Sequence, residues 1–275
     1  MSLAKSGLKP FTLAFVQLGQ IGANKTENLK HAREMILKAA SSQGHSKKPD
    51  LVVLPEYFNT PYGDVSLSDF AEEVVFEPGK PYDATTSKSQ TVNMLASAAK
   101  ETGTWLIGGE LVAKHRKVHL FDVDIPGKIT VKESAFLNPG AATSFFDTEF
   151  ARIGLGVCYD VRFPELAMIS ARRGGCQVLI YPGAFTMATG PLHWELLQRS
   201  RAVDNQVFMG MCSPARNTKA TLVAVSEYRG KVLVEAGDSE EIVYVDIDPE
   251  VLESARSGIP VTTQRRFDVY TNVAE

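Results

Sequence analysis

The stretch Gly154-Leu-Gly-Val-Cys-Tyr-Asp-Val-Arg-Phe-Pro-Glu-Leu166 joins an apolar strand to a helix through a short turn. We expect the strand to end at Val157, where the β-prone run stops, and the helix to begin near Pro164, because proline is favoured in the first helical turn. Such a turn exposes a side chain at the end of a sheet and directs backbone N–H groups toward it. Cys158 is therefore a candidate nucleophile, although an arbitrary buried cysteine more often has a structural role.

Outward from this stretch the chain alternates apolar strands with amphipathic helices. Short β-prone runs predict strands over 11–18, 50–55, 104–108, 153–157, 176–181 and 207–212, and apolar spacing predicts helices over 24–40, 91–102, 164–173 and 194–205. This order predicts an α/β fold whose sheets are covered by helices. Because the sequence contains no linker, repeat or low-complexity tract, we expect a single domain over residues 1–275.

The composition is typical of a globular protein, with 44% hydrophobic and 22% charged residues and a net charge of -3. The near-neutral charge argues against a general nucleic-acid binder. Three cysteines without paired spacing, Cys158, Cys176 and Cys212, argue against a disulfide framework or a metal site and favour a reducing compartment. No run approaches the roughly 20 apolar residues of a membrane span. We therefore expect a soluble protein of the cytoplasm, or of mitochondria, without membrane partners.

Glu56 is a second candidate for chemistry. It follows the apolar residues Leu51-Val-Val-Leu54 and Pro55, so its carboxyl is expected at the end of a buried strand. Burial there would raise its pKa and suit it to accept a proton from a thiol and return it to a leaving amine. From the local sequence alone, a solvated loop glutamate is the somewhat more common case.

The basic run Lys114-His-Arg-Lys-Val-His-Leu120 provides a third candidate. If the run is a strand, alternation directs His115, Lys117 and His119 to one face. A buried lysine would supply a fixed positive charge for an oxyanion, whereas a histidine would pair with Cys158 as in thiol proteases. An exposed edge strand is the more frequent origin of such a run. The spacing does not distinguish the lysine from the histidines.

Three segments together resemble the nitrilase, or carbon–nitrogen hydrolase, superfamily. They are Leu-Pro-Glu at 54–56, Lys-His-Arg-Lys-Val-His-Leu at 114–120 and Gly-Val-Cys-Tyr-Asp-Val-Arg-Phe-Pro-Glu at 156–165, in the family's order. Each segment alone is weak, but the combination is highly specific, and similarity extends from about residue 12 to about residue 270. The resemblance implies an α-β-β-α sandwich, in which two stacked sheets lie between pairs of helices.

The resemblance also implies roles for four residues. Glu56 corresponds to the general base, Lys117 to the residue that stabilises the oxyanion, and Cys158 to the nucleophile. A further family glutamate, which holds the lysine and the reacting groups in place, corresponds to Glu133. No local pattern would have selected Glu133 without the resemblance. The family's reaction needs no metal and no organic cofactor.

Two tyrosines are expected at the substrate. The backbone N–H of Tyr159, next to the nucleophile, is expected to help bind the oxyanion. Tyr62, shortly after Glu56, is a candidate for the pocket wall, although a packed loop aromatic explains it equally well.

Further segments are similar to omega-amidases of the Nit2 type within this superfamily. They are Tyr181-Pro-Gly-Ala-Phe185, 189–195, 201–206 and Ser213-Pro-Ala-Arg-Asn217. The similarity implies that the chain hydrolyses the terminal amide of 2-oxoglutaramate or 2-oxosuccinamate through a cysteine thioester, releasing ammonia. Arg162 and Arg216 are candidates for binding the substrate carboxylate, although either could be structural.

Other functions stay open at this point. A deaminated-glutathione amidase of the Nit1 type would use the same catalytic residues, as would a nitrile hydrolase, which is the less favoured of the two. A catalytically silent scaffold is expected to have lost Glu, Lys or Cys, and all three are present. Family members usually form homodimers through helices that follow the nucleophile, here 164–173 and 194–205. We expect a homodimer, although core packing explains the apolar positions of these helices equally well.

Two junctions lack segments that the family normally has. A hairpin with a Tyr-Asn pair is absent between Gly109 and the basic run, and a Gly-His-Ser segment is absent before the strand that ends at Val225. A single strand from Trp105 to Phe121 would exceed ~50 Å at about 3.3 Å per residue, well beyond the usual length. We therefore expect residues to be missing from this sequence at Glu110–Leu111 and near Thr221–Leu222.

Overall fold

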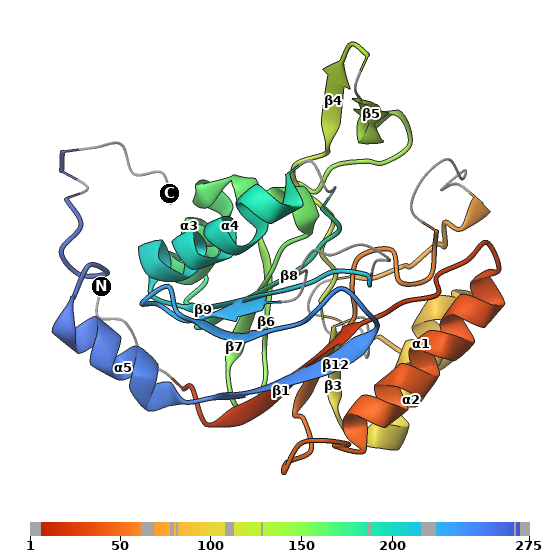
Figure 1. Cartoon of the computed structure of the whole chain (residues 1–275), viewed down its shortest axis with the longest axis horizontal. Helices are drawn as coiled ribbons and strands as arrows, with labels where there is room; N and C mark the ends of the chain where they lie inside the picture. Colours follow the sequence, from red (N-terminus) through yellow and green to blue (C-terminus); the bar gives the residue numbers. More distant parts are fainter. Residues whose placement is uncertain are drawn as a thin grey trace.

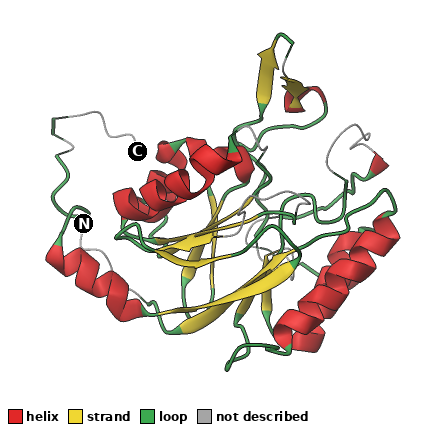
Figure 2. Ribbon diagram, in the orientation of Figure 1, coloured by secondary structure: helices red, strands yellow, loops and turns green. Residues whose placement is uncertain are grey.

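In the computed structural model, two β-sheets pack face to face and each outer face is covered by a pair of helices (Figure 1, Figure 2). The structure describes residues 7–61, 69–77, 80, 82–107, 113–127, 129–185, 189–215, 224–266 and 268–269. The predicted four-layer α-β-β-α sandwich is therefore confirmed.

The first sheet has the strand order β12-β1-β2-β3 and is covered by helices α1 and α2. These elements are β1 (Phe11–Gln17), α1 (Lys25–Ala40), β2 (Leu51–Val53), α2 (Gln90–Thr102), β3 (Trp105–Ile107) and β12 (Glu241–Ile247). β2 runs parallel to β1 and β3, whereas β12 runs antiparallel to β1. Asn24 and Ser89 begin the two helices, because their side chains accept hydrogen bonds from the first free backbone N–H groups.

The second sheet has the order β11-β10-β9-β8-β7-β6 and is covered by α3 and α4. These elements are β6 (Ser144–Asp147), β7 (Arg152–Leu155), α3 (Pro164–Arg172), β8 (Val178–Pro182), α4 (Gly190–Asn205), β9 (Phe208–Cys212), β10 (Ala224–Ser226) and β11 (Val232–Glu235). β7, β8 and β9 are parallel, so their carboxyl ends meet at one edge of the sheet.

Strand alternation divides the buried side chains among three cores. In β1, Leu13 and Phe15 lie in the core between the two sheets, while Ala14 and Val16 lie in the core beneath α1 and α2. In β8, Ile180 belongs to the core between the sheets and its neighbours belong to the core beneath α3 and α4. Successive residues of a strand point to opposite faces, so these strands are apolar throughout because both faces are covered.

The two sheets fit closely where the ring of Phe15 crosses the gap between them. A Cβ atom built on Gly210 of β9 would lie 2.6 Å from Cζ of Phe15. Only glycine leaves room for the ring at this point, because real Cβ atoms do not approach other carbon atoms so closely.

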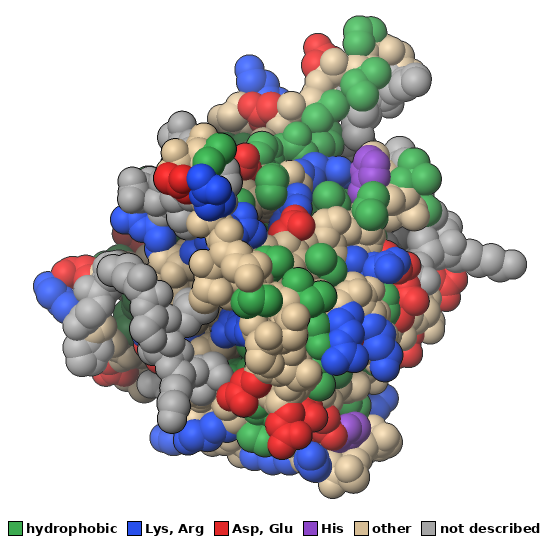
Figure 3. All heavy atoms as spheres, turned by 90° about the vertical axis from the view of Figure 1, so that its left-hand side faces the viewer, with side chains coloured by type: hydrophobic (Ala, Val, Ile, Leu, Met, Phe, Trp, Pro, Cys, Tyr) green, Lys and Arg blue, Asp and Glu red, His purple; other side chains and the backbone are tan. Residues whose placement is uncertain are grey.

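Four further elements lie outside the four layers. The strands β4 (Asp122–Ile125) and β5 (Ile129–Lys132) form a hairpin that projects from the body, followed by the short 3₁₀ turn η3 (Glu133–Ala135). Figure 3 shows the projection at the top of the molecule, and the side chains of Ile125 and Phe136 are exposed along it. Helix α5 (Pro249–Gly258) follows β12 at the opposite side of the molecule from α1 (Figure 1).

The predicted elements lie where expected, with ends that differ by a few residues. The largest boundary difference is in α4, which begins at Gly190 rather than at Trp194, because proline in its first turn initiates a helix. The strands β4, β5, β6, β11 and β12 and the helix α5 were not predicted, although Asp248-Pro249-Glu250 is a typical helix start. The strand considered for residues 114–120 does not form, since these residues have irregular backbone.

Both junctions at which residues are expected to be missing, Glu110–Leu111 and Thr221–Leu222, lie outside the described residues. Among the described helices, none is long and apolar enough to cross a membrane.

Candidate active site

Cys158 begins the 3₁₀ turn η4 (Cys158–Arg162), which follows β7 and leads into α3, as the sequence predicts. Its backbone φ is +47°, in the left-handed region that residues with a Cβ atom rarely adopt. Gly183, at the end of β8, passes so close that a Cβ there would lie 3.0 Å from Cα of Cys158. The thiol, within 3.5 Å of the carbonyl oxygen of Ala184, is therefore set at the carboxyl edge of β7 and β8.

Glu56 lies just beyond the carboxyl end of β2, in the opposite sheet. Leu54, which precedes it by two residues, is anchored in the core beneath α1 and α2. One carboxylate oxygen of Glu56, Oε1, lies 3.4 Å from Nζ of Lys117. The other, Oε2, is buried without a hydrogen-bond partner among the described residues and is free to interact with a reacting group.

Lys117 extends from the irregular segment 113–120 into a pocket that Glu56, Glu133 and Cys158 also line. Its side chain is buried, and its ammonium donates to Oε1 of Glu133 at 2.9 Å as well as lying beside Glu56. The backbone carbonyl of Lys117 accepts from Gly140 N–H at 2.8 Å. Lys117 therefore forms the centre of a buried cluster with one carboxyl on each side.

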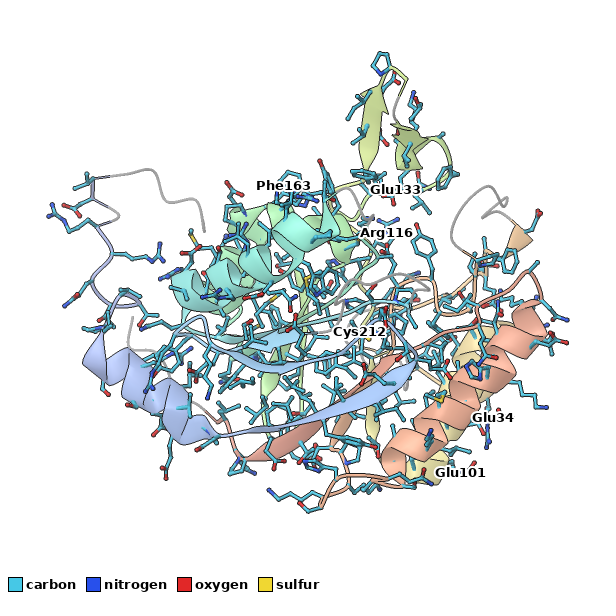
Figure 4. The ribbon with its side chains drawn as sticks, viewed as in Figure 1. Glu34, Glu101, Arg116, Glu133, Phe163 and Cys212 are labelled. Carbon is cyan, nitrogen blue, oxygen red and sulfur yellow. The ribbon has the colours of Figure 1, made fainter. Side chains whose placement is uncertain are left out.

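Glu133 lies at the foot of the β4–β5 hairpin, where Figure 4 labels it. Its second oxygen, Oε2, accepts the backbone N–H of Phe121 at 2.7 Å. The carboxyl therefore connects Lys117 to the backbone four residues further along the chain. Tyr57, which sequence reasoning did not select, also lines this pocket, and its hydroxyl lies 3.5 Å from Oε1 of Glu133.

Burial and mutual charge set the protonation of this cluster. Burial raises the pKa of Glu56, and the attraction of Lys117 offsets this only in part. Burial and the negative charge of Glu56 raise the pKa of the Cys158 thiol, so the thiol rests protonated. Burial lowers the pKa of Lys117, but the negative charges of Glu56 and Glu133, and that of the Cys158 sulfur when it is deprotonated, outweigh burial and raise the pKa, so Lys117 remains an ammonium.

The two histidines of the basic run bind Asp160 and do not line the pocket. Nε2 of His115 lies 3.3 Å from Oδ2 of Asp160, and Nδ1 of His119 lies 2.8 Å from Oδ1 of the same carboxylate. Lys117, between them, contacts the glutamates instead. The condition on which the three side chains would share one face, a strand over 114–120, is not met, and the irregular backbone separates the lysine from the histidines.

Among the described residues, the pocket is also lined by the rings of Phe121, Tyr159 and Phe185 and by Arg162. Tyr159 packs edge-on against Phe121 and Phe163, and the guanidinium of Arg162 lies over the ring of Phe185 at 4.7 Å. Both Tyr159 and Arg162 line the pocket together with the cluster residues. Tyr62 and Arg216, the other predicted substrate residues, lie outside the described part of the chain.

The other two cysteines are buried in the cores. Cys212 lies between the two sheets, where Figure 4 labels it, and its thiol donates to the carbonyl of Val16 at 3.3 Å. Cys176 belongs to the core beneath α3 and α4. Within the described residues, no group of three or more His, Cys, Asp or Glu side chains is placed to hold a metal ion.

Comparison with known proteins connects this geometry to a family. The carbon–nitrogen hydrolase family matches residues 12–257. The chain is 44% identical to omega-amidase NIT3 of Saccharomyces cerevisiae, with 99% of each chain covered, and 46% identical to human omega-amidase NIT2, with 94% of this chain and 96% of NIT2 covered. The crystal structure of Saccharomyces cerevisiae Nit3 superposes with a TM-score of 0.78 at 40% identity, covering 96% of this chain and 100% of Nit3.

The alignment with yeast NIT3 extends over 301 positions, more than the 275 residues of this chain. NIT3 therefore has residues without a counterpart here, although the position of such residues at the two junctions stays a prediction. Full-length identity above 40%, a family match over most of the chain and a shared four-layer structure together show that this protein belongs to the carbon–nitrogen hydrolase family.

Proposed function

We propose that the chain is an omega-amidase that hydrolyses the terminal amide of 2-oxoglutaramate or 2-oxosuccinamate to the 2-oxo dicarboxylic acid and ammonia. The observation that carries the proposal is the buried cluster in which Lys117 lies between Glu56 and Glu133 and lines one pocket with Cys158. The similarity to omega-amidases NIT2 and NIT3 supports the choice of substrate.

The reaction begins with proton transfer from the thiol. Glu56, whose pKa is raised by burial, accepts the proton of Cys158, and the sulfur attacks the amide carbon. The carbonyl oxygen becomes an oxyanion, which the ammonium of Lys117 and the backbone N–H of Tyr159 stabilise. When the oxyanion collapses, the C–N bond breaks and Glu56 returns the proton to the nitrogen, so ammonia leaves.

Water completes the cycle. Glu56 is again a carboxylate and removes a proton from a water molecule, which attacks the thioester carbon. Collapse of this second oxyanion breaks the C–S bond and releases the free acid, and the proton on Glu56 returns to the sulfur. Glu133 takes no proton, and its bond to Lys117 keeps the ammonium in place through both halves of the reaction.

Arg162 is the candidate for binding the substrate carboxylate. Its guanidinium contacts His193 Nδ1 at 3.0 Å and Thr189 Oγ1 at 3.2 Å, and within the described chain it makes no ion pair with a carboxylate. A positive charge at the pocket mouth without an acidic partner favours an anionic substrate. Arg162→Gln is expected to raise KM for 2-oxoglutaramate by about 10- to 100-fold, the loss of a charge-assisted hydrogen bond, and KM for an uncharged amide much less.

The test of the function is ammonia release from a panel of small carboxamides that includes 2-oxoglutaramate and deaminated glutathione. We expect 2-oxoglutaramate to be turned over fastest, and faster turnover of deaminated glutathione would replace the substrate assignment. Cys158→Ala is expected to abolish turnover and to retain the fold. Cys212→Ala is the matched control, since this buried thiol lies between the sheets. Undiminished turnover by Cys158→Ala would exclude the thiol as nucleophile.

We also propose that the chain forms one domain and assembles as a homodimer through α4. Leu192, Leu196 and Val203 are exposed on this helix, at spacings of four and seven residues that place them along one side. Leu196→Glu is therefore expected to give a monomer in light scattering, and an unchanged mass would exclude α4 as the interface. A cytoplasmic or mitochondrial location is proposed from the three cysteines, which are free in the structure.

A further inference from the structure

Asp160 is a buried carboxylate that the proposed reaction does not use. It lies in η4, two residues after Cys158, and its side chain is 0% exposed. A buried carboxylate is costly unless hydrogen bonds replace its hydration. Such bonds are present here, and they come from two segments that are distant in the sequence.

On the side of the nucleophile, Asp160 closes the turn around Cys158. Its Oδ2 accepts the backbone N–H of Val157 at 3.0 Å, and its own N–H donates to the carbonyl of Val157 at 3.0 Å. These two bonds bracket Cys158, whose φ of +47° is unfavourable for a residue with a side chain. Such a conformation persists only where the surroundings enforce it.

On the side of the lysine, the same carboxylate holds the backbone directly after Lys117. Val118 N–H lies 3.2 Å from Oδ1 and 3.3 Å from Oδ2, and His119 N–H donates to Oδ1 at 2.9 Å. The imidazoles of His115 and His119 add bonds to the two oxygens. One side chain therefore fixes the backbone on both sides of the gap between the ammonium and the thiol.

Within the described residues, segment 113–120 is held by individual hydrogen bonds and not by a helix or a strand ladder. It forms neither helix nor strand, so it lacks the repeating hydrogen bonds that hold Cys158 at the end of β7. Its other bonds include Gly140 N–H to the carbonyl of Lys117, and Ser144 Oγ to the carbonyl of Lys114 at 3.2 Å. Asp160 contributes more hydrogen bonds to this segment than either of these residues.

We infer that Asp160 is a positioning residue, which sets the distance between the Lys117 ammonium and the Cys158 thiol by binding the backbone of both segments. This inference rests on the proposed function of these two residues. The carboxylate is suited to the role because it stays ionised. Burial raises the pKa of Asp160, but the bonds from His115, from the backbone of Val157 and from His119 outweigh burial and lower it.

Asp160→Asn keeps the shape of the side chain but removes the charge and one acceptor. We expect kcat to fall by about 10- to 100-fold, because a displacement of about 1 Å in a catalytic group has an effect of this size, with little change in KM. The amides of Val118 and His119 are expected to exchange with solvent faster. Asp246→Asn is the matched control, since Asp246 accepts from Thr12 in the first sheet, away from the pocket.

The decisive readout is the pH profile of Cys158 alkylation by iodoacetamide. The titratable groups that line the pocket with the thiol are Glu56, Lys117 and Glu133. The titratable groups near Asp160 are His115, His119 and the buried phenol of Tyr181. The ammonium of Lys117 favours the thiolate, so its displacement in Asp160→Asn moves the profile to higher pH. A purely structural Asp160 would lower stability and leave both the profile and kcat, counted per Cys158 thiol that iodoacetamide can titrate, at wild-type values. That result would overturn the inference.

His119→Ala keeps the bonds to the backbone amides and serves if Asp160→Asn does not fold. It is expected to shift the alkylation profile in the same direction by a smaller amount, and an unshifted profile in the variant that can be purified would overturn the inference. Alkylation requires no amide substrate. Failure of the wild type to release ammonia from any amide in the panel would therefore count against the proposed function and leave the test of Asp160 intact.

Discussion

The thiol and the ammonium of the cluster are held in different ways. Cys158 extends from the end of β7, a strand with ladder partners on both sides, and enters a turn that continues into α3. Lys117 extends from irregular backbone, and its position depends on individual side-chain bonds such as those from Glu133 and Asp160. We therefore distinguish a strand side of the site, which is β7 and the turn at Cys158, from an irregular side, which is the segment that carries Lys117. Substitutions on the strand side should mainly lower the free energy of unfolding, whereas substitutions on the irregular side should mainly lower kcat.

Among substitutions that leave the Cys158 thiol in place, the largest effect is expected for Lys117→Met, which removes the charge that faces the oxyanion. Loss of one oxyanion-stabilising group costs about 10²–10³ in kcat. Lys114→Met is the matched control, because this lysine, three residues earlier, donates to the carbonyl of Val74 at 2.8 Å and not to the cluster. Ammonia release and thermal unfolding measure the pair, and a comparable loss of kcat in both variants would refute the special role of Lys117.

Gly154→Ala tests the strand side. A Cβ at this position of β7 would lie 2.6 Å from Cδ2 of the buried Leu179 and 3.1 Å from Sγ of Cys176. Overpacking of this kind lowers the free energy of unfolding by about 1–3 kcal/mol. Urea unfolding should show the lower free energy of unfolding. The kcat, counted per Cys158 thiol that can be titrated with iodoacetamide, should stay near the wild-type value. A large fall in kcat with unchanged stability would contradict the expectation that the strand side mainly determines stability.

Glu133→Gln sharpens the comparison through pH. The negative charge of Glu133 raises the pKa of Glu56, so its removal lowers that pKa. The base must be ionised to accept the thiol proton, and activity falls as pH falls through its pKa. The acid limb of kcat/KM should therefore move to lower pH in the variant, with a lower maximum because Lys117 loses its 2.9 Å partner. A shift to higher pH would contradict this electrostatic coupling.

Ser144→Ala should have the smallest effect. The hydroxyl donates to the carbonyl of Lys114 and lies 3.2 Å from Nδ1 of His115, so it supports only the start of the irregular segment. Loss of one neutral hydrogen bond is worth about 1 kcal/mol, which corresponds to about a fivefold change if it is expressed entirely in kcat. Steady-state kinetics with a thermal melt would show whether this small change affects turnover or stability.

The sequence predicted the strand side of the site much better than the irregular side. Apolar periodicity and the proline at 164 located the turn at Cys158, and the apolar run before Glu56 placed that carboxyl at a strand end. The resemblance to the family supplied Lys117 and Glu133, which no local pattern distinguishes from surface residues. Asp160 was missed because its partners follow Lys117, and only the folded chain brings them to the carboxylate. Arrangements made by tertiary contact alone leave no periodic signal.

The ring of Phe15 over Gly210 has a consequence for how the chain finds its register. All seven residues of β1 are buried, so a slip by one position would exchange two apolar sets, and polarity would barely oppose it. Size opposes it instead. The slip would turn Phe15 into the core beneath α1 and α2, where the smaller Ala14 and Val16 now pack with Ala32 and Ala39, and would leave a void above Gly210. The register of β1 is therefore set by the sizes of its side chains and of their partners, whereas in half-exposed sheets it is set by the alternation of apolar and polar residues.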